Sequence, residues 1–267
     1  AAWAEAAPTG LRPLWQARRA DAAPGWLGWA PLDEPVPALP PLQAVLVLSG
    51  VTPGAAAPLS DNAALALAGL EAAAAAGARH VFLASSQAVY TPAGHPLAEG
   101  DPVAPLSPYG AAKAEMEEAA ARWLATAGPG APGITCLRIG NVAGADLLGR
   151  RLGAGRPIRL DRFPDGRGPE RSYIGAGGFA RVMESLLAAV RAGRELPFAL
   201  NVAAPRPVAM EALLRAWGQG WSWCDAPPGA RQSVRLDVAA LCRLHDFGAQ
   251  DNAAAQMVAE WRRLGRA

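Results

Sequence analysis

The chain contains few of the residues that bind metals or cross-link secreted proteins. It has three cysteines and three histidines among 267 residues. The cysteines are odd in number, stand far apart and form no CxxC pair, which excludes a disulfide framework and favours a reducing compartment. The histidines are isolated, so no metal-ligand spacing is present. We therefore expect a cytoplasmic protein without a metal site.

Long apolar runs and blocks of charge are also missing. The longest apolar runs, such as residues 63–76, are rich in alanine and too weak or too short to span a bilayer. Residues 1–5 lack the basic and apolar regions of a signal peptide. The net charge is +2, with acids and bases spread along the chain. These absences predict neither a membrane nor a nucleic-acid partner.

Lysine is the scarcest basic residue, because Lys113 is the only lysine among 25 basic residues. This scarcity suggests a position that arginine cannot fill, since only lysine has a tunable pKa. Tyr109 stands four residues earlier, which would place both side chains on one helix face. A nearby ammonium lowers the pKa of a phenol from its usual value near ~10. The pair thus predicts a proton-transfer device, the alternative being a surface tyrosine beside a chance lysine.

Short apolar runs alternate with helical stretches along the chain. This rhythm predicts an α/β fold, with a parallel sheet covered by helices on both faces. The predicted strands are residues 11–16, 44–49, 80–86, 134–139 and 198–203. The predicted helices are residues 61–76, 109–127 and 176–192.

Two serines, Ser85 and Ser86, close the predicted strand 80–86. Ligands of parallel α/β sheets lie at the carboxyl ends of the strands. The helix with Tyr109 and Lys113 follows, so Ser86, Tyr109 and Lys113 are predicted to converge on one carbonyl or alcohol. There the serine would hold the reacting oxygen and the phenol would transfer its proton, while hydride moves to or from carbon.

Three segments, residues 83–90, 107–113 and 137–144, resemble the NAD-dependent epimerase/dehydratase family, the extended branch of the short-chain dehydrogenases/reductases. The likeness runs from about residue 11 to the C-terminus. It implies a Rossmann-like, doubly wound parallel sheet with a small, mostly helical substrate lobe. The implied dinucleotide-binding domain is residues 1–144, to which 173–203 return. The implied substrate lobe is residues 145–172 and 204–267.

The resemblance also implies roles for individual residues. Ser86, Tyr109 and Lys113 would be catalytic, and Tyr109 and Lys113 would also contact the cofactor, Lys113 through the nicotinamide ribose. The other cofactor-binding residues it implies are Ser49, Gly50, Val51, Asn62, Ser85, Ile139 and Gly140. The implied substrate-binding residues are Ser86, Gln87, Asn141 and Arg171.

The front of the chain departs from the family pattern. No glycine-rich turn for the pyrophosphate is present, so we expect a βα unit of ~20–30 residues upstream of Ala1. A divergent enzyme with poor cofactor affinity is the alternative. The predicted strand 11–16 is followed by Arg18 and Arg19 without an acid, which favours NADP over NAD as the cofactor. The alternative is that both arginines belong to a solvated loop.

The substrate is defined less well by the sequence. Gln87 and Ala88 replace the acidic pair of sugar-nucleotide 4,6-dehydratases, which argues against dehydration. Arg171 and Asn141 favour a nucleotide sugar, whereas the glycine-rich segment 175–178 weakens that assignment. We therefore expect an NAD(P)-dependent epimerase or reductase acting at a secondary alcohol or ketone. The alternative is a non-catalytic NAD(P) sensor on the same fold. The likeness also implies a homodimer.

Overall fold

The computed structural model describes residues 11–19 and 25–264. Its centre is a four-stranded sheet in the order β10-β5-β4-β3, with every neighbouring pair parallel. The strands are β3 (Ala44–Val47), β4 (His80–Ser86), β5 (Gly133–Ile139) and β10 (Ala199–Val202). Near-continuous apolar runs such as β4 are typical of parallel strands buried on both faces.

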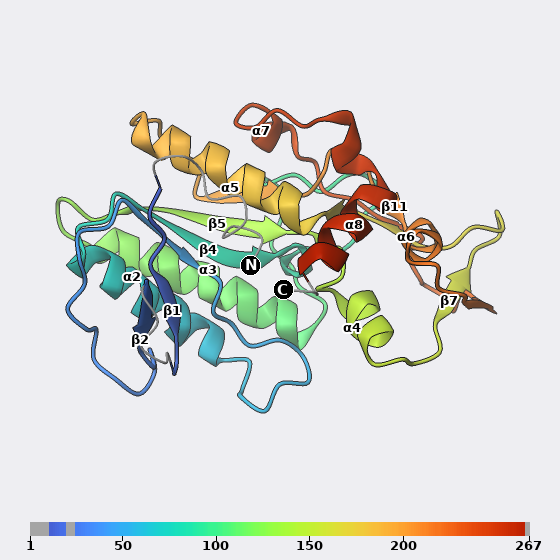
Figure 1. Ribbon diagram of the computed structural model, residues 1–267, viewed down its shortest axis with the longest axis horizontal. Helices are drawn as coiled ribbons and strands as arrows, with labels where there is room; N and C mark the ends of the chain where they lie inside the picture. Colours follow the sequence, from blue (N-terminus) through green and yellow to red (C-terminus); the bar gives the residue numbers. More distant parts are fainter. Residues whose placement is uncertain (1–10, 20–24, 265–267) are drawn as a thin grey trace.

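Helices cover both faces of this sheet (Figure 1). The helices are α2 (Asp61–Ala75) and α3 (Pro108–Thr126) on one face and α5 (Ala176–Arg191) on the other. Successive side chains of β4 point to opposite faces: Val81 and Leu83 pack in one core cluster with α2 and α3, and Phe82 packs in the other with α5. This arrangement confirms the doubly wound, Rossmann-like α/β fold.

The start of α3 is fixed by local chemistry. The Ser107 hydroxyl accepts a hydrogen bond from the amide of Gly110 at 3.1 Å, and a proline occupies the first turn. A Cβ added to Gly110 would lie 2.1 Å from the Ala88 carbonyl oxygen. Only glycine therefore allows α3 to begin this close to the 3-10 turn η1 (Gln87–Val89), which directly follows β4.

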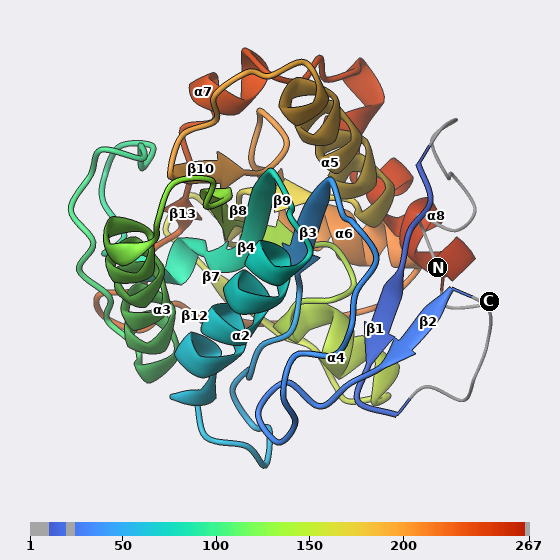
Figure 2. The same cartoon turned by 90° about the vertical axis from the view of Figure 1, so that its left-hand side faces the viewer.

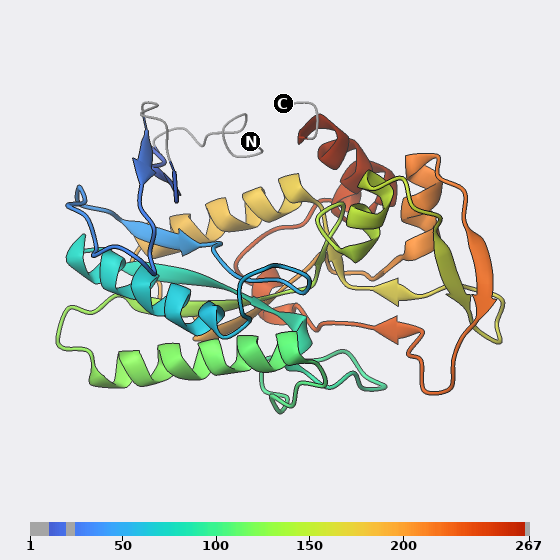
Figure 3. The ribbon, with the colours of Figure 1, turned by 90° about the horizontal axis from the view of Figure 1, so that it is seen from below.

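The N-terminal strand differs from its prediction. The predicted strand 11–16 becomes β1 (Trp15–Ala17), which pairs in parallel with β2 (Trp26–Gly28), a strand that the sequence did not indicate. This pair forms its own sheet and stands apart from the four-stranded sheet, of which β3 is the edge (Figures 2 and 3). Each strand spans three residues and has no fully buried side chain. The two strands are therefore stabilised by pairing with each other rather than by packing into the core.

The region beyond β5 mixes short strands with helices. Its strands are β6 (Asn141–Val142), β7 (Arg159–Arg162), β8 (Glu170–Arg171), β9 (Tyr173–Ile174), β11 (Val208–Ala209), β12 (Ser222–Asp225) and β13 (Ser233–Val234). Its helices, besides α5, are α4 (Leu147–Gly153), α6 (Met210–Trp217), α7 (Ala239–Cys242) and α8 (Ala254–Leu264). The predicted lobe thus contains more strand than expected, and its boundaries stay a prediction.

Two absences concern the described part of the chain. Within residues 11–19 and 25–264, no helix has the length and apolarity needed to cross a membrane. Over the same residues, no three acidic, histidine or cysteine side chains gather as metal ligands would.

Candidate active site

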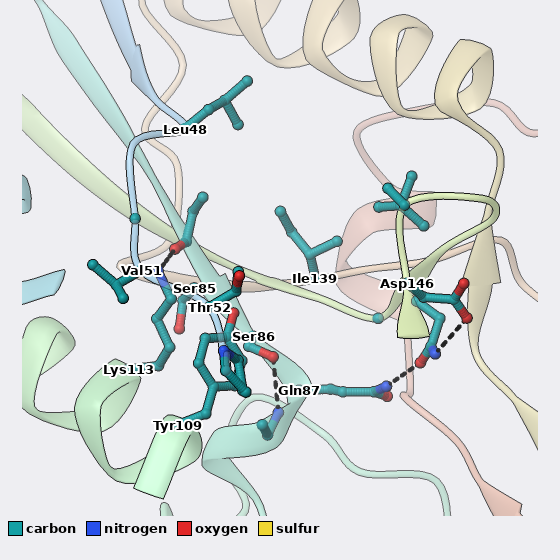
Figure 4. Close-up of a pocket in the computed structure, with 18 of the residues that line it drawn as sticks. Leu48, Val51, Thr52, Ser85, Ser86, Gln87, Tyr109, Lys113, Ile139 and Asp146 are labelled. Carbon is teal, nitrogen blue, oxygen red and sulfur yellow. Dashed lines mark hydrogen bonds between the residues drawn. The ribbon is translucent and has the colours of Figure 1, made fainter. Parts of the chain in front are cut away.

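A cavity of about 360 Å³ opens where β3, β4 and β5 end (Figure 4). This is the edge at which parallel α/β sheets bind ligands. Ten of the predicted site residues line it: Gly50, Val51, Ser85, Ser86, Gln87, Tyr109, Lys113, Ile139, Gly140 and Asn141. Nine further residues, which were not predicted as site residues, line it as well: Leu48, Thr52, Pro53, Ala84, Ala88, Val142, Ala145, Asp146 and Arg150.

The catalytic candidates lie together in this cavity. Ser86 is the last residue of β4, and its hydroxyl accepts a hydrogen bond from the Ala88 amide at 3.2 Å. The Tyr109 phenol, in the first turn of α3, lines the same cavity, close enough to the Ser86 side chain for Ser86 to lower the pKa of Tyr109. Two hydroxyl groups therefore meet at one point of the cavity wall, where a substrate oxygen can contact both.

Lys113 lies one helical turn after Tyr109 and is almost completely buried. Its Nζ donates a hydrogen bond to the Ala84 carbonyl oxygen at 2.7 Å and stands 6.0 Å from the centroid of the Tyr109 ring. Burial lowers the pKa of Lys113 to about 8, an effect that the negative charge of Glu117 partly opposes. An ammonium has three protons to donate, so Lys113 retains donors for a ligand in the cavity.

The expected lowering of the Tyr109 pKa by Lys113 is wrong for this structure. Burial raises the pKa of Tyr109 above its ordinary value, and the interaction with the Ser86 side chain opposes that rise. The cation that acts against the rise is Arg150, one of the residues missed in the sequence. Desolvation outweighs both effects, because burial disfavours the charged phenolate.

The segment that turns after β3 forms part of the cavity wall. Asn62, at the start of α2, accepts a hydrogen bond from the Val51 amide and donates one to the Val51 carbonyl, both at 3.1 Å. A Cβ on Gly50 would lie 2.9 Å from the Asn62 Oδ1 and 3.1 Å from the Lys113 Nζ. Asn62 thus shapes the turn from behind, and its predicted cofactor contact stays a prediction.

A chain of polar side chains forms a further wall. The Gln87 amide donates to Asn141 Oδ1 at 2.5 Å, and the Asn141 amide donates to Asp146 Oδ2 at 3.3 Å. The same Asp146 oxygen accepts from the Tyr173 hydroxyl at 2.7 Å, while its Oδ1 accepts from the Gly149 amide at 2.9 Å. The Oε1 of Gln87 is buried without a hydrogen-bond partner in the described chain, so this wall offers a free acceptor to a ligand.

Ser85 is turned away from the cavity chemistry. Its hydroxyl donates to Glu117 Oε1 at 2.5 Å. Glu117 also forms an ion pair with Arg138, whose Nη2 donates a hydrogen bond to the Glu117 Oε2 at 2.7 Å. Glu117 lies one turn after Lys113 on α3, and Arg138 lies on β5. The buried ion pair therefore joins the helix of Lys113 to the sheet beneath the cavity.

Four other predicted residues do not line the cavity. Arg171 donates to the carbonyl oxygens of Glu170 at 2.7 Å, Gln232 at 2.8 Å and Arg231 at 3.1 Å, and thereby ties β8 to the segment before β13. Arg18 and Arg19 are exposed after β1, and Ser49 is exposed after β3. Their contacts with substrate or cofactor stay predictions.

Known proteins share both sequence and fold features with this chain. Residues 43–161 match the model of the NAD dependent epimerase/dehydratase family. Among curated proteins, none matches the chain.

Similar solved structures include MoeE5 in complex with UDP-glucuronic acid and NAD, at 22% identity and a TM-score of 0.70, covering 94% of this chain and 90% of that one. The UDP-N-acetylglucosamine 4-epimerase from Methanobrevibacter ruminantium M1 has 17% identity and a TM-score of 0.69, covering 91% and 83%. TunA, an NAD dependent NDP-hexosamine 5,6-dehydratase, has 19% identity and a TM-score of 0.67, covering 92% and 88%. At such identities the likeness establishes the fold. Residues 43–161 thus resemble the NAD-dependent epimerase/dehydratase family in sequence, and the chain shares its fold with nucleotide-sugar epimerases and dehydratases.

Proposed function

We propose that this protein is an NAD-dependent epimerase or reductase that acts at a secondary alcohol or ketone of a nucleotide sugar. The observation that carries the proposal is that Ser86 and Tyr109 line one cavity at the carboxyl end of the sheet, with Lys113 buried one helical turn after Tyr109. The similar enzymes that are described with UDP-sugars or an NDP-hexosamine support the substrate class.

The residues around the cavity fit a nicotinamide dinucleotide. Gly50 and Val51 present main chain to the cavity, and Lys113 keeps protons for ribose hydroxyls. When bound, the cofactor supplies the hydride acceptor or donor. MoeE5 and TunA are both described with NAD, and neither supports the NADP preference inferred from Arg18 and Arg19. We therefore propose NAD as the cofactor.

Tyr109 handles the proton in this proposal. Because burial raises its pKa, the phenol is protonated at neutral pH and stands ready to donate a proton to the oxygen of a ketone. Ser86 holds the same oxygen through its hydroxyl. In the opposite direction, Tyr109 must first lose its proton, and the positive charge of Arg150 favours that phenolate.

Elimination of water is not part of the proposal. Among the described residues that line the cavity, Asp146 is the only carboxylate. Both of its oxygens accept hydrogen bonds, from Tyr173 and Asn141 on one side and from Gly149 on the other. A carboxylate held in this way supports the wall better than it transfers protons.

The variant Tyr109→Phe tests the proposal. It keeps the ring but removes the acid, so turnover should fall by roughly 10²–10⁴-fold. NAD binding, followed by calorimetry, should remain close to that of the wild type. The substrates are UDP-galactose, UDP-N-acetylglucosamine and UDP-glucuronic acid, beside simple ketones with NADH or NADPH.

The alternative class is a dinucleotide sensor without catalysis. A sensor would bind NAD, turn over none of these substrates and lose nothing on Tyr109→Phe. Turnover that survives this change at the wild-type rate would refute the mechanism. The homodimer and the cytoplasmic location stay predictions, of which sedimentation measurements test the first.

A further inference from the structure

Arg150 is a cation at the cavity whose charge no described residue neutralises. It lies on α4, one turn after Asp146, and its amide donates to the Asp146 carbonyl oxygen at 3.0 Å. Its side chain lines the cavity, yet within the described chain the guanidinium forms no ion pair or hydrogen bond. By contrast, Arg138 is paired with Glu117.

The other charges of the cavity leave this cation uncompensated. Asp146 is the carboxylate nearest to Arg150 in sequence, but its oxygens are occupied by Tyr173, Asn141 and Gly149. The second cation, Lys113, is buried and bonded to a carbonyl oxygen. The cavity is lined by two cations and by one carboxylate that is already hydrogen-bonded. The excess positive charge produces a positive electrostatic potential, which attracts an anionic ligand.

Arg150 also lies within electrostatic reach of the reacting point. Its charge acts on the Tyr109 phenol, against the rise in pKa that burial causes. Because Arg150 and Tyr109 also line the same cavity, an anion bound by Arg150 would share that cavity with the oxygen that Tyr109 protonates. Arg171, from which the family likeness implies a phosphate contact, has its guanidinium bonded to three carbonyl oxygens instead.

We propose that Arg150 binds an anionic group of the substrate beside the carbon at which Tyr109 acts. This inference rests on the proposed function of the cavity. A guanidinium presents parallel N–H donors that match a carboxylate or a phosphate. The anion is either a carboxylate on the sugar ring, as in a nucleotide-linked uronic acid, or the diphosphate of any nucleotide sugar.

Two ligands and one matched pair of variants separate these sources. The ligands are UDP-glucuronic acid and UDP-glucose, which share the diphosphate and differ in the carboxylate. The variants are Arg150→Gln and Arg151→Gln, because both arginines are exposed but only Arg150 lines the cavity. Dissociation constants are measured by calorimetry on the NAD-loaded protein, so that no turnover is needed.

If Arg150 binds the ring carboxylate, Arg150→Gln should weaken UDP-glucuronic acid about tenfold, equivalent to about 1.4 kcal/mol. UDP-glucose should then bind as before. Equal weakening of both ligands would identify the diphosphate as the anion. Arg151→Gln should change neither, and Arg150→Lys should restore part of the affinity because it keeps the charge without the planar fork.

Wild-type affinity for both ligands in Arg150→Gln would overturn the inference, as would an equal loss in Arg151→Gln. Failure of the wild type to bind either nucleotide sugar would also overturn it. In that case, NAD binding together with Tyr109-dependent turnover of a neutral ketone would leave the proposed hydride chemistry standing. The two proposals can therefore fail separately.

Discussion

The buried ion pair below the site gives a sharp test of the structure. Glu117 and Arg138 are each 5% exposed. The guanidinium donates from Nε to Oε1 at 3.1 Å and from Nη2 to Oε2 at 2.7 Å, and the Ser85 hydroxyl donates to Oε1 at 2.5 Å. Glu117→Gln keeps the shape of the side chain but removes its charge. Arg138 would then remain buried without a counter-charge.

The magnitude follows from the burial. Breaking a buried ion pair by removing one partner costs about 3–5 kcal/mol, because it leaves an uncompensated charge in the interior. Arg138 cannot escape by losing its proton, since the hydrogen bond and charge of Glu117 raise a pKa that is already very high for arginine. For a protein of this size each kcal/mol shifts Tm by roughly 2–4 °C. Glu117→Gln should thus lower Tm by roughly 6–20 °C.

Glu118 on the same helix provides the matched control. It forms a pair with Arg122 at 3.6 Å in which the side chains are 70% and 67% exposed. Exposed pairs contribute about 0–1 kcal/mol, so Glu118→Gln should change the free energy of unfolding very little. Both variants are compared with the wild type by urea unfolding at one pH and salt concentration.

The double variant Glu117→Leu with Arg138→Met, measured beside the single variants Glu117→Leu and Arg138→Met, gives a double-mutant cycle. It removes both charges, so it should be less destabilised than Glu117→Gln alone. If Glu117→Gln lowered the free energy of unfolding by less than about 1 kcal/mol, the reasoning would be refuted, because removing one partner of a buried ion pair should destabilise the protein by more than that. So would a double variant whose loss equals the sum of the two single losses, because contacting residues should not be additive.

A tight contact and a buried histidine give two further predictions. Gly110→Ala would bring a Cβ within 2.1 Å of the Ala88 carbonyl oxygen. This overpacking should lower the free energy of unfolding by about 1–3 kcal/mol and reduce turnover. Gly128→Ala is the control, because a Cβ there would meet open space and should change neither quantity. Unchanged melting of Gly110→Ala would contradict the close approach. Burial lowers the pKa of His80 from 6.5 to about 4. As the pH falls from 6.5 towards 4, the histidine therefore gains a proton in the unfolded state only, and the folded state loses stability. The free energy of unfolding should drop by roughly 2 kcal/mol more between pH 7 and pH 5 in the wild type than in His80→Gln, and equal slopes would show that this ring is accessible to protons.

The sequence by itself predicted the convergence of Ser86, Tyr109 and Lys113 and the central fold. The strand ending at Ser86 is a local apolar run, and the spacing of Tyr109 and Lys113 places them one turn apart on any helix. Parallel strands bring their carboxyl ends to one edge, so these residues meet whatever the rest of the chain does. Gln87 and Asn141, which also line the cavity, were implied only by the family resemblance.

Only the tertiary structure decided the electrostatics and the outer wall. Asp146 and Arg150 line the cavity because α4 and its N-cap lie beside it, and no helix was predicted there from the sequence. Arg171 turns to carbonyl oxygens because β8 pairs with a strand some sixty residues later. The Tyr109 pKa rises because burial is set by all the elements packed around a side chain, whereas spacing along a helix specifies only its neighbours.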